Sequence, residues 1–92
     1  MNTHKSADLL NKEISEVKKL VPIGSLWAHF KSPDHNYEVT GIAVIESTDG
    51  IGVLYKSTFK PTKGITFLRP IESFLSDKET KDGRVKRFTM VS

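Results

Sequence analysis

The stretch "YEVTGIAVIESTDGIGVLYKS", residues 37–57, decides the fold. It begins with alternating apolar and polar residues. The following "GIAVI" (41–45) is apolar on both faces, which indicates a long strand covered on both sides. Gly41 within this strand predicts a bulge or a bend. "TDG" (48–50) holds an Asp-Gly pair typical of a hairpin turn, and "IGVLYKS" (51–57) is the expected return strand. The chain therefore centres on an antiparallel β-hairpin.

Upstream, "SADLLNKEISEVKKL" (6–20) predicts an amphipathic helix. Ser6 is a suitable N-cap, and Pro22 and Gly24 end the helix. Apolar residues recur at steps of four, three and four and so share one face: Leu10, Ile14, Val17 and Val21. This face needs a partner, which is either the rest of the domain or a second copy of the chain.

Between helix and hairpin, "SLWAHF" (25–30) has a period of two and predicts a strand. "SPDHN" (32–36) is rich in turn-forming residues and predicts the turn that follows. The strand is expected to place alternate residues on its two faces: Leu26, Ala28 and Phe30 inward, and Trp27, His29 and Lys31 on the other side. Phe30 is therefore expected in the core, as is Phe74.

The rest of the chain adds short elements. The expected order is a strand at 65–69, a helical turn at 70–76, a charged turn at 77–83 and a final strand at 84–91. One helix and five strands predict a mainly β (α+β) fold, a small SH3-like antiparallel barrel or roll of about five strands with an N-terminal helix. The helix would occupy residues 1–22 and the β-barrel domain residues 23–92.

The chain has 92 residues, enough for one domain with a modest core, so self-association is expected to add stability. It contains no cysteine, which excludes a disulfide framework, a thiol nucleophile and any cysteine-based zinc site. The N-terminus lacks an apolar stretch of signal-peptide length, and no run approaches the roughly 20 apolar residues of a membrane span. These features predict a cytoplasmic protein.

The net charge is +3, and residues 78–92 carry all of this excess, with five Lys or Arg against two acids. A basic patch attracts phosphate groups, whether of nucleic acid or of a small nucleotide. A solvated C-terminal hairpin would explain the same charge equally well. Both interpretations stay open on the sequence alone.

Catalytic and metal-binding patterns are weak. His29 and His35, with Asp34, could in principle ligate zinc or iron, but their spacing matches no standard site. The sequence therefore predicts no metal and no cofactor, with His35 at the surface. It also lacks a Gly-x-Ser-x-Gly elbow and a close pair of acids. We expect no enzyme; the minor alternative uses His29 with Glu38 or Asp34 as general acid and base.

Aromatic residues and cations stand next to each other at several points of the expected strands. Rings stack on bases and cations hold phosphates, so this composition is typical of a nucleotide or single-strand site. Arg69 precedes Pro70, which favours an extended backbone at a strand end; a salt bridge to Glu38 or Glu72 is the structural alternative. Trp27 is expected in a ligand pocket or a subunit interface. The predicted ligand-binding residues are Trp27, His29, Lys31, Tyr37, Tyr55, Lys56, Phe67, Arg69 and Arg87.

Five motifs follow one another in the β domain: His-aromatic-Lys (29–31), Tyr-Glu-Val-x-Gly-x-Ala (37–43), Val-x-Tyr (53–55), aromatic-x-Arg-Pro-x-x-x-Phe (67–74) and Arg-Phe (87–88). In this order, over residues 23–91, they resemble a family of short bacterial and phage proteins catalogued as domain of unknown function 1653. The chain departs from that pattern in a longer-looking turn at 32–35 and in its N-terminal helix. The family label implies no reaction, but its distribution implies a phage-associated role.

The residues predict a non-enzymatic, homo-oligomeric binding protein for a small anionic, nucleotide-like ligand. Rings would sandwich the base or ribose, and Lys31, Arg69 and Arg87 would neutralise phosphate. By analogy with small phage proteins that block host defence, the resemblance implies an anti-defence sponge in the host cytoplasm, sequestering a host immune signalling nucleotide. The alternative is an SH3-like nucleic-acid- or protein-binding module whose basic segment at 78–87 tracks phosphates.

Overall fold

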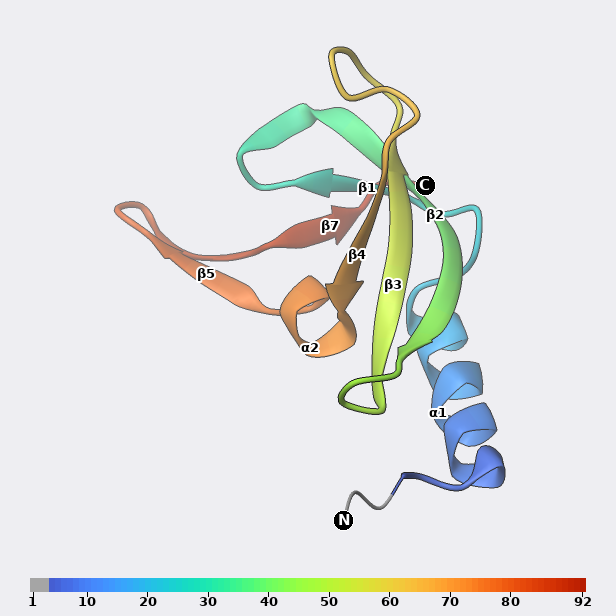
Figure 1. The fold of residues 1–92 in the computed structure, drawn as a ribbon. Coiled ribbons are helices and arrows are strands. Elements are labelled where there is room, and N and C mark those ends of the chain that lie inside the picture. Colours follow the sequence, from blue (N-terminus) through green and yellow to red (C-terminus); the bar gives the residue numbers. More distant parts are fainter. Residues whose placement is uncertain (1–3) are drawn as a thin grey trace.

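The computed structural model describes residues 4–92, which form two antiparallel sheets and two helices (Figure 1). The larger sheet has the strand order β4-β3-β2-β1-β7, and the smaller is the hairpin β5–β6. The strands are β1 (Leu26–His29), β2 (Ser32–Ile45), β3 (Gly50–Ser57), β4 (Thr66–Pro70), β5 (Asp77–Thr80), β6 (Gly83–Lys86) and β7 (Phe88–Met90); the helices are α1 (Ala7–Leu20) and α2 (Ile71–Phe74).

The expected mainly β fold with an N-terminal helix is confirmed. The described residues form seven strands instead of about five, and the larger sheet curls into an open roll that does not close into a barrel. Neither helix within residues 4–92 combines the length and the apolar composition that a membrane span requires.

The β2–β3 hairpin is the centre of the larger sheet, as the sequence predicted. Val39 pairs with Tyr55 and Gly41 with Leu54, so Thr40 is the extra residue of a bulge and the expected irregularity at Gly41 is confirmed. The turn occupies residues 46–49 and ends on Asp49, whose φ of 57° is a left-handed conformation that Asp tolerates better than most residues. The strand residues 41–45 are only half-buried, which corrects the expectation that both faces of this segment are covered.

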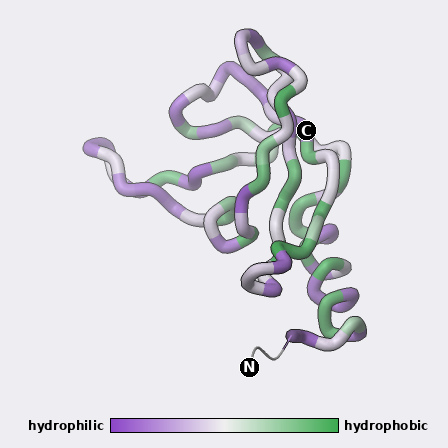
Figure 2. The backbone as a smooth tube through the Cα atoms, in the orientation of Figure 1, coloured by the Kyte–Doolittle hydropathy of each residue, from purple (hydrophilic) through white to green (hydrophobic). Residues whose placement is uncertain are grey.

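Two expected turns are wrong. Residues 32–36 belong to β2, because the chain already reverses at residues 30–31. The charged segment 77–83 and the segment 84–91 form the hairpin β5–β6 followed by β7. The hairpin extends away from the larger sheet and is hydrophilic along most of its length (Figures 1 and 2).

Helix α1 packs on its own domain, which resolves the alternative left open by its apolar face. The Ser6 side chain accepts a hydrogen bond from the Leu9 N–H (3.1 Å), so the expected N-cap is confirmed. Val17 and Val21 are buried, and Val21 belongs to the main core cluster. At the other end, Asp49 accepts hydrogen bonds from the Lys5 N–H (2.7 Å) and from His4 (3.0 Å). Thus α1 is held at both ends on the same chain.

The hydrophobic core lies inside the curl of the larger sheet. Phe74 from α2 is fully buried there, and its ring stacks on Phe88 at 4.4 Å and 8°. The core placement of Phe74 is therefore confirmed, whereas Phe30 is only half-buried in the turn and its core placement is wrong. The core cluster contains Val21, Trp27, Val39, Val53, Tyr55, Phe74 and Phe88.

Trp27 was expected on the face away from the core, and the structure corrects this. Its side chain is 6% exposed, lies edge-on to Phe74 at 5.1 Å and donates a hydrogen bond from Nε1 to Ser25 Oγ (2.8 Å). The reason is the position of β1 between β2 and β7, where Trp27 pairs with Tyr37 and His29 with Phe88. These partners place the Trp27 face of β1 inside the curl.

Candidate functional site

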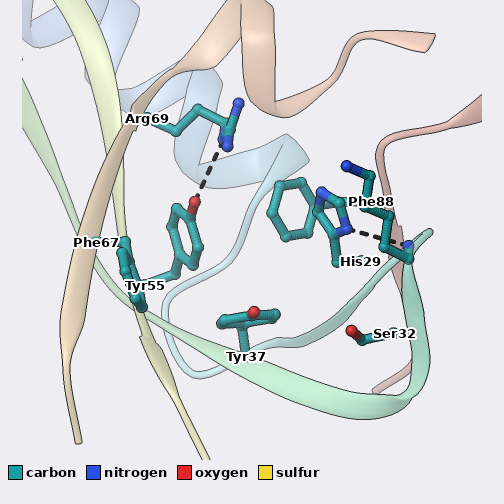
Figure 3. A pocket seen from close by; sticks show the side chains of 8 residues that line it. His29, Ser32, Tyr37, Tyr55, Phe67, Arg69 and Phe88 are labelled. Atoms are coloured by element: carbon teal, nitrogen blue, oxygen red, sulfur yellow. Dashed lines mark hydrogen bonds between the residues drawn. The ribbon is translucent and has the colours of Figure 1, made fainter. Parts of the chain in front are cut away.

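A cavity of about 310 Å³ opens inside the curl, near the turn between β1 and β2 (Figure 3). It receives side chains from five strands of the larger sheet and from that turn, so residues far apart in sequence converge on it. Its lining residues are His29, Lys31, Ser32, Tyr37, Tyr55, Phe67, Arg69 and Phe88.

Four aromatic rings form the floor of the cavity. Tyr55 and Phe67 are stacked at 5.8 Å and 30°. Tyr37 stands edge-on to both of these rings and to Phe88, with centroid distances of 5.5, 6.3 and 6.0 Å. Each ring already touches its neighbours at distances typical of aromatic pairs. Tyr55 and Phe88 are almost completely buried, at 5% and 3% exposure, so the ring surface open to the cavity comes from Tyr37 and Phe67.

Arg69 stands above this floor at the end of β4. Its Nε donates to the Tyr55 hydroxyl (3.3 Å) and its Nη1 donates to Ser73 Oγ (2.9 Å), while its guanidinium carbon lies 5.9 Å from the Phe88 ring centroid. These contacts hold the guanidinium in one orientation. The expected structural alternative, a salt bridge to Glu38 or Glu72, is wrong for residues 4–92: Glu38 pairs with Lys56 (3.9 Å), and Arg69 takes part in no ion pair there.

His29 lies at the edge of the floor, with its ring edge-on to Phe88 at 5.0 Å. The backbone N–H of Lys31 donates to His29 Nδ1 (3.1 Å), so the neutral ring carries its proton on Nε2 (Figure 3). Burial lowers the pKa of His29 below its ordinary value, and the charges of Arg69, Arg87 and Lys31 lower it further. At neutral pH this ring is therefore an uncharged hydrogen-bond donor.

The electrostatic character of the cavity is positive. Its lining contains Lys31 and Arg69 and no acidic residue. Arg87 lies outside the lining, where its Nε donates to Ser76 Oγ (3.1 Å), but its charge still acts on His29. Among residues 4–92, none of these three cations forms an ion pair. Burial, with a contribution from Tyr55, raises the pKa of Tyr37, so that its phenol keeps its proton.

Six of the nine predicted ligand-binding residues line the cavity: His29, Lys31, Tyr37, Tyr55, Phe67 and Arg69. The other three do not. Trp27 is in the core, Lys56 pairs with Glu38 away from the cavity, and Arg87 sits beyond its edge.

The sequence interpretation missed Ser32 and Phe88. Ser32 lies in the segment that was expected to be a turn. Phe88, which also joins the core, was named only as part of the Arg-Phe motif at 87–88, and its position next to Arg87 was the signal that could have found it.

The histidine pair that raised the question of a metal does not converge. His35 packs on Phe59, with ring centroids 4.3 Å apart, whereas His29 lies at the cavity. Within residues 4–92, no group of three or more His, Asp or Glu side chains is placed to hold a metal ion.

Comparisons with known proteins identify the family. A crystal structure of a DUF1653 protein from Bordetella bronchiseptica is similar to this chain, with a TM-score of 0.65, 22% sequence identity, and coverage of 75% of this chain and 86% of the other. This likeness supports the fold. No curated protein sequence matches the chain significantly. The sequence model of the family described as "Protein of unknown function (DUF1653)" matches residues 25–90. The chain therefore belongs to the DUF1653 family.

Proposed function

We propose that this protein binds a small anionic, nucleotide-like ligand and releases it unchanged. The observation that carries the proposal is the cavity with its aromatic floor and its rim, which is positively charged because Lys31 and Arg69 lie there. Neither cation has an acidic partner among residues 4–92. Lys31 is exposed and Arg69 is half-buried, so both charges can meet an anion that enters the cavity. The volume of about 310 Å³ lies at the lower end of the range for small-molecule sites.

The arrangement of the rings sharpens how a ligand would lie. The sequence-based hypothesis placed a base or ribose between two rings. The two rings that remain open to the cavity, Tyr37 and Phe67, stand at 79° to each other, which favours stacking on the face of one ring. The anionic group would then be directed to the rim, where Arg69 is already oriented by Tyr55 and Ser73. Such pre-orientation lowers the entropy lost when a ligand is bound.

The contacts of His29 support binding over catalysis. A general base needs a free lone pair, and His29 Nδ1 already accepts the Lys31 N–H. Holding a ligand without transforming it lowers the free concentration of that ligand. If the ligand is a host signalling nucleotide, this is the sponge role, in phage anti-defence and in the host cytoplasm.

The alternative function, a nucleic-acid-binding module, depends on the basic C-terminal segment. In the hairpin β5–β6, Arg84 contacts Asp77 (3.5 Å) and Glu79 (3.4 Å). The segment 78–87 contains five Lys or Arg and two acids, a net charge of +3, but Arg84 is engaged in these two ion pairs and Arg87 donates to Ser76. Since nucleic-acid affinity depends on cations that are free to meet phosphates, the hairpin favours this function less than the cavity favours a small ligand.

The test is isothermal titration with mononucleotides, cyclic nucleotides and ADP-ribose, on the wild type, Arg69→Gln and Lys56→Gln. The two variants each remove one positive charge, but only Arg69 lines the cavity. A charged hydrogen bond contributes about 1.5–3 kcal/mol, so Arg69→Gln should weaken binding by about 10- to 100-fold. Lys56→Gln should change it by less than about twofold.

Two outcomes would contradict the proposal. The first is that no compound of the panel binds. The second is that chromatography of the denatured complex recovers a cleaved product in place of the added ligand.

A further inference from the structure

We infer that the cavity selects a terminal phosphate monoester. It does not distinguish the bases by their hydrogen-bonding edges when a base is attached. This inference rests on the proposed function and names the ligand class of that same site. It follows from the donors and acceptors that the lining side chains still have available once their contacts within the protein are counted.

Free donors dominate the rim. A guanidinium has five N–H groups, and Arg69 uses one on Tyr55 and one on Ser73, which leaves the other three for a ligand. The Lys31 ammonium forms no ion pair within residues 4–92. His29 adds the Nε2–H that its bond to the Lys31 backbone leaves exposed. These groups suit a ligand that presents several acceptor oxygens close together.

Acceptors are scarce by comparison. The lining contains no Asp, Glu, Asn or Gln side chain, which are the residues that usually receive the amino groups of adenine, guanine or cytosine. His29 Nδ1 is occupied by the Lys31 N–H, and the Tyr55 oxygen accepts from Arg69. The hydroxyl groups of Ser32 and Tyr37 remain, and each can act as donor or acceptor, so they do not distinguish one base edge from another. A base would therefore be held by its face on the aromatic floor, and every base has such a face.

The charge of the site favours a dianion. The positive charges of Lys31, Arg69 and Arg87 all act on His29, and the lining offers no carboxylate against them. A phosphate monoester carries about −1.5 to −2 charges at pH 7 and has three acceptor oxygens, whereas a diester carries one charge and has two unesterified oxygens. The monoester therefore uses more of the free donors and neutralises more of the charge.

The experiment is a titration calorimetry panel on the wild-type protein at pH 7.5 and one ionic strength. The panel contains AMP, CMP, GMP, UMP, phenyl phosphate, inorganic phosphate, 3′,5′-cyclic AMP and adenosine. The four nucleoside monophosphates should bind within about threefold of one another, because the lining side chains do not distinguish the hydrogen-bonding edges of the bases. Phenyl phosphate should bind in the same range, inorganic phosphate more weakly because it lacks the ring, and cyclic AMP at least about tenfold more weakly than AMP. Adenosine should show no binding.

Two results would overturn the inference while leaving the proposed function intact: a preference of more than about tenfold for one base, or equal affinity for cyclic AMP and AMP. If no phosphate compound binds, the inference and the proposed function fail together. As a second measurement, Lys31→Gln, which alters only a turn residue, should weaken all four monophosphates by a similar factor. A loss restricted to one base would contradict the inference.

Discussion

His29 shows how three neighbouring cations and one backbone contact define the role of a residue. Its ring accepts the Lys31 N–H, touches Phe88 and lies within reach of the charges of Arg69 and Arg87. No acidic side chain lines the cavity beside it, and Tyr37, which lines the same cavity, keeps its proton. Burial disfavours the protonated ring, and protonation would add a further positive charge beside these cations, so the pKa of His29 is lowered.

This lowered pKa predicts a pH dependence of stability. Because the pKa of His29 is lower in the folded protein than in the unfolded chain, the unfolded chain takes up the proton first as pH falls. The stabilisation is therefore complete above the unfolded value of about 6.5 and is lost as pH falls from there through the lowered folded pKa. The melting temperature of the wild type should fall more steeply between pH 7 and pH 5 than that of His29→Gln.

The control for this prediction is His35→Gln, a histidine that packs on Phe59 away from the cavity. The change in slope caused by His29→Gln should exceed the change caused by this control, because both substitutions remove one histidine but only His29 lies at the cavity beside Lys31 and Arg69. Identical slopes for the wild type and His29→Gln would contradict the role assigned to the His29 environment.

Trp27 illustrates the limit of sequence interpretation at the scale of one residue. A period of two assigns Trp27 and Ala28 to opposite faces, but it does not say which face is inside. Both residues are buried, at 6% and 9% exposure, so the surroundings of β1 decide their roles. Those surroundings are β2 and β7, which come from later in the chain.

Among the elements, α1 was the most predictable, because its signals are local. Its cap, its apolar spacing and the residues that end it all lie within the helix or next to it. The hairpin β5–β6 was the least predictable, because its strands have only four residues each and are mostly polar and exposed. Its pairing relies on the backbone ladder and on cross-strand contacts such as that of Arg84 with Asp77.

The packing of α1 on its own domain gives a prediction for this element. Val17 is 7% exposed and Leu20 is 59% exposed. Val17→Ala removes two buried methyl groups and should lower the free energy of unfolding by about 1.5 kcal/mol, at roughly 0.8 kcal/mol for each methyl group. Leu20→Ala, on the exposed face of the same helix, should change it by less than about 0.5 kcal/mol.

Chemical denaturation monitored by circular dichroism measures both variants of α1. Equal effects of the two substitutions would mean that the helix does not pack in solution as the structure shows. The comparison is well matched, since each variant places alanine at a helical position and helix propensity changes little for Leu and modestly for Val.

In the whole molecule, the core and the cavity share side chains. Phe88 lines the cavity on one side, and on the other it stacks against Phe74, which belongs to the core. Tyr55 is likewise a core residue whose hydroxyl helps to orient Arg69. The floor of the site is thus also the edge of the hydrophobic core. The expected homo-oligomer remains a prediction beside this single-chain architecture.

This shared packing predicts a coupled effect on stability and binding. Phe74→Leu keeps an apolar side chain of similar size but removes the ring stacked on Phe88, and it should destabilise the protein by about 1–2 kcal/mol. It should also weaken ligand binding, because the Phe88 ring loses its support. Thermal melts and calorimetry on the same sample measure both effects. Leu75→Ala, a neighbour with 41% exposure, should affect neither; a destabilised Phe74→Leu protein with unchanged affinity would show that core and cavity are independent.

The sequence by itself determined the local elements: the capped helix, the central hairpin with its bulge, the helical turn at Phe74, and six of the residues that line the cavity. Each of these depends on signals within a few residues, namely spacing, caps, turns and neighbouring ring–cation pairs. Only the tertiary structure decided that Trp27 is inside, that Phe88 closes the floor, and that Arg69 is oriented by Tyr55 and Ser73. These outcomes depend on which strands lie next to one another and on how the sheet curls, and both are fixed by contacts between residues far apart in the chain.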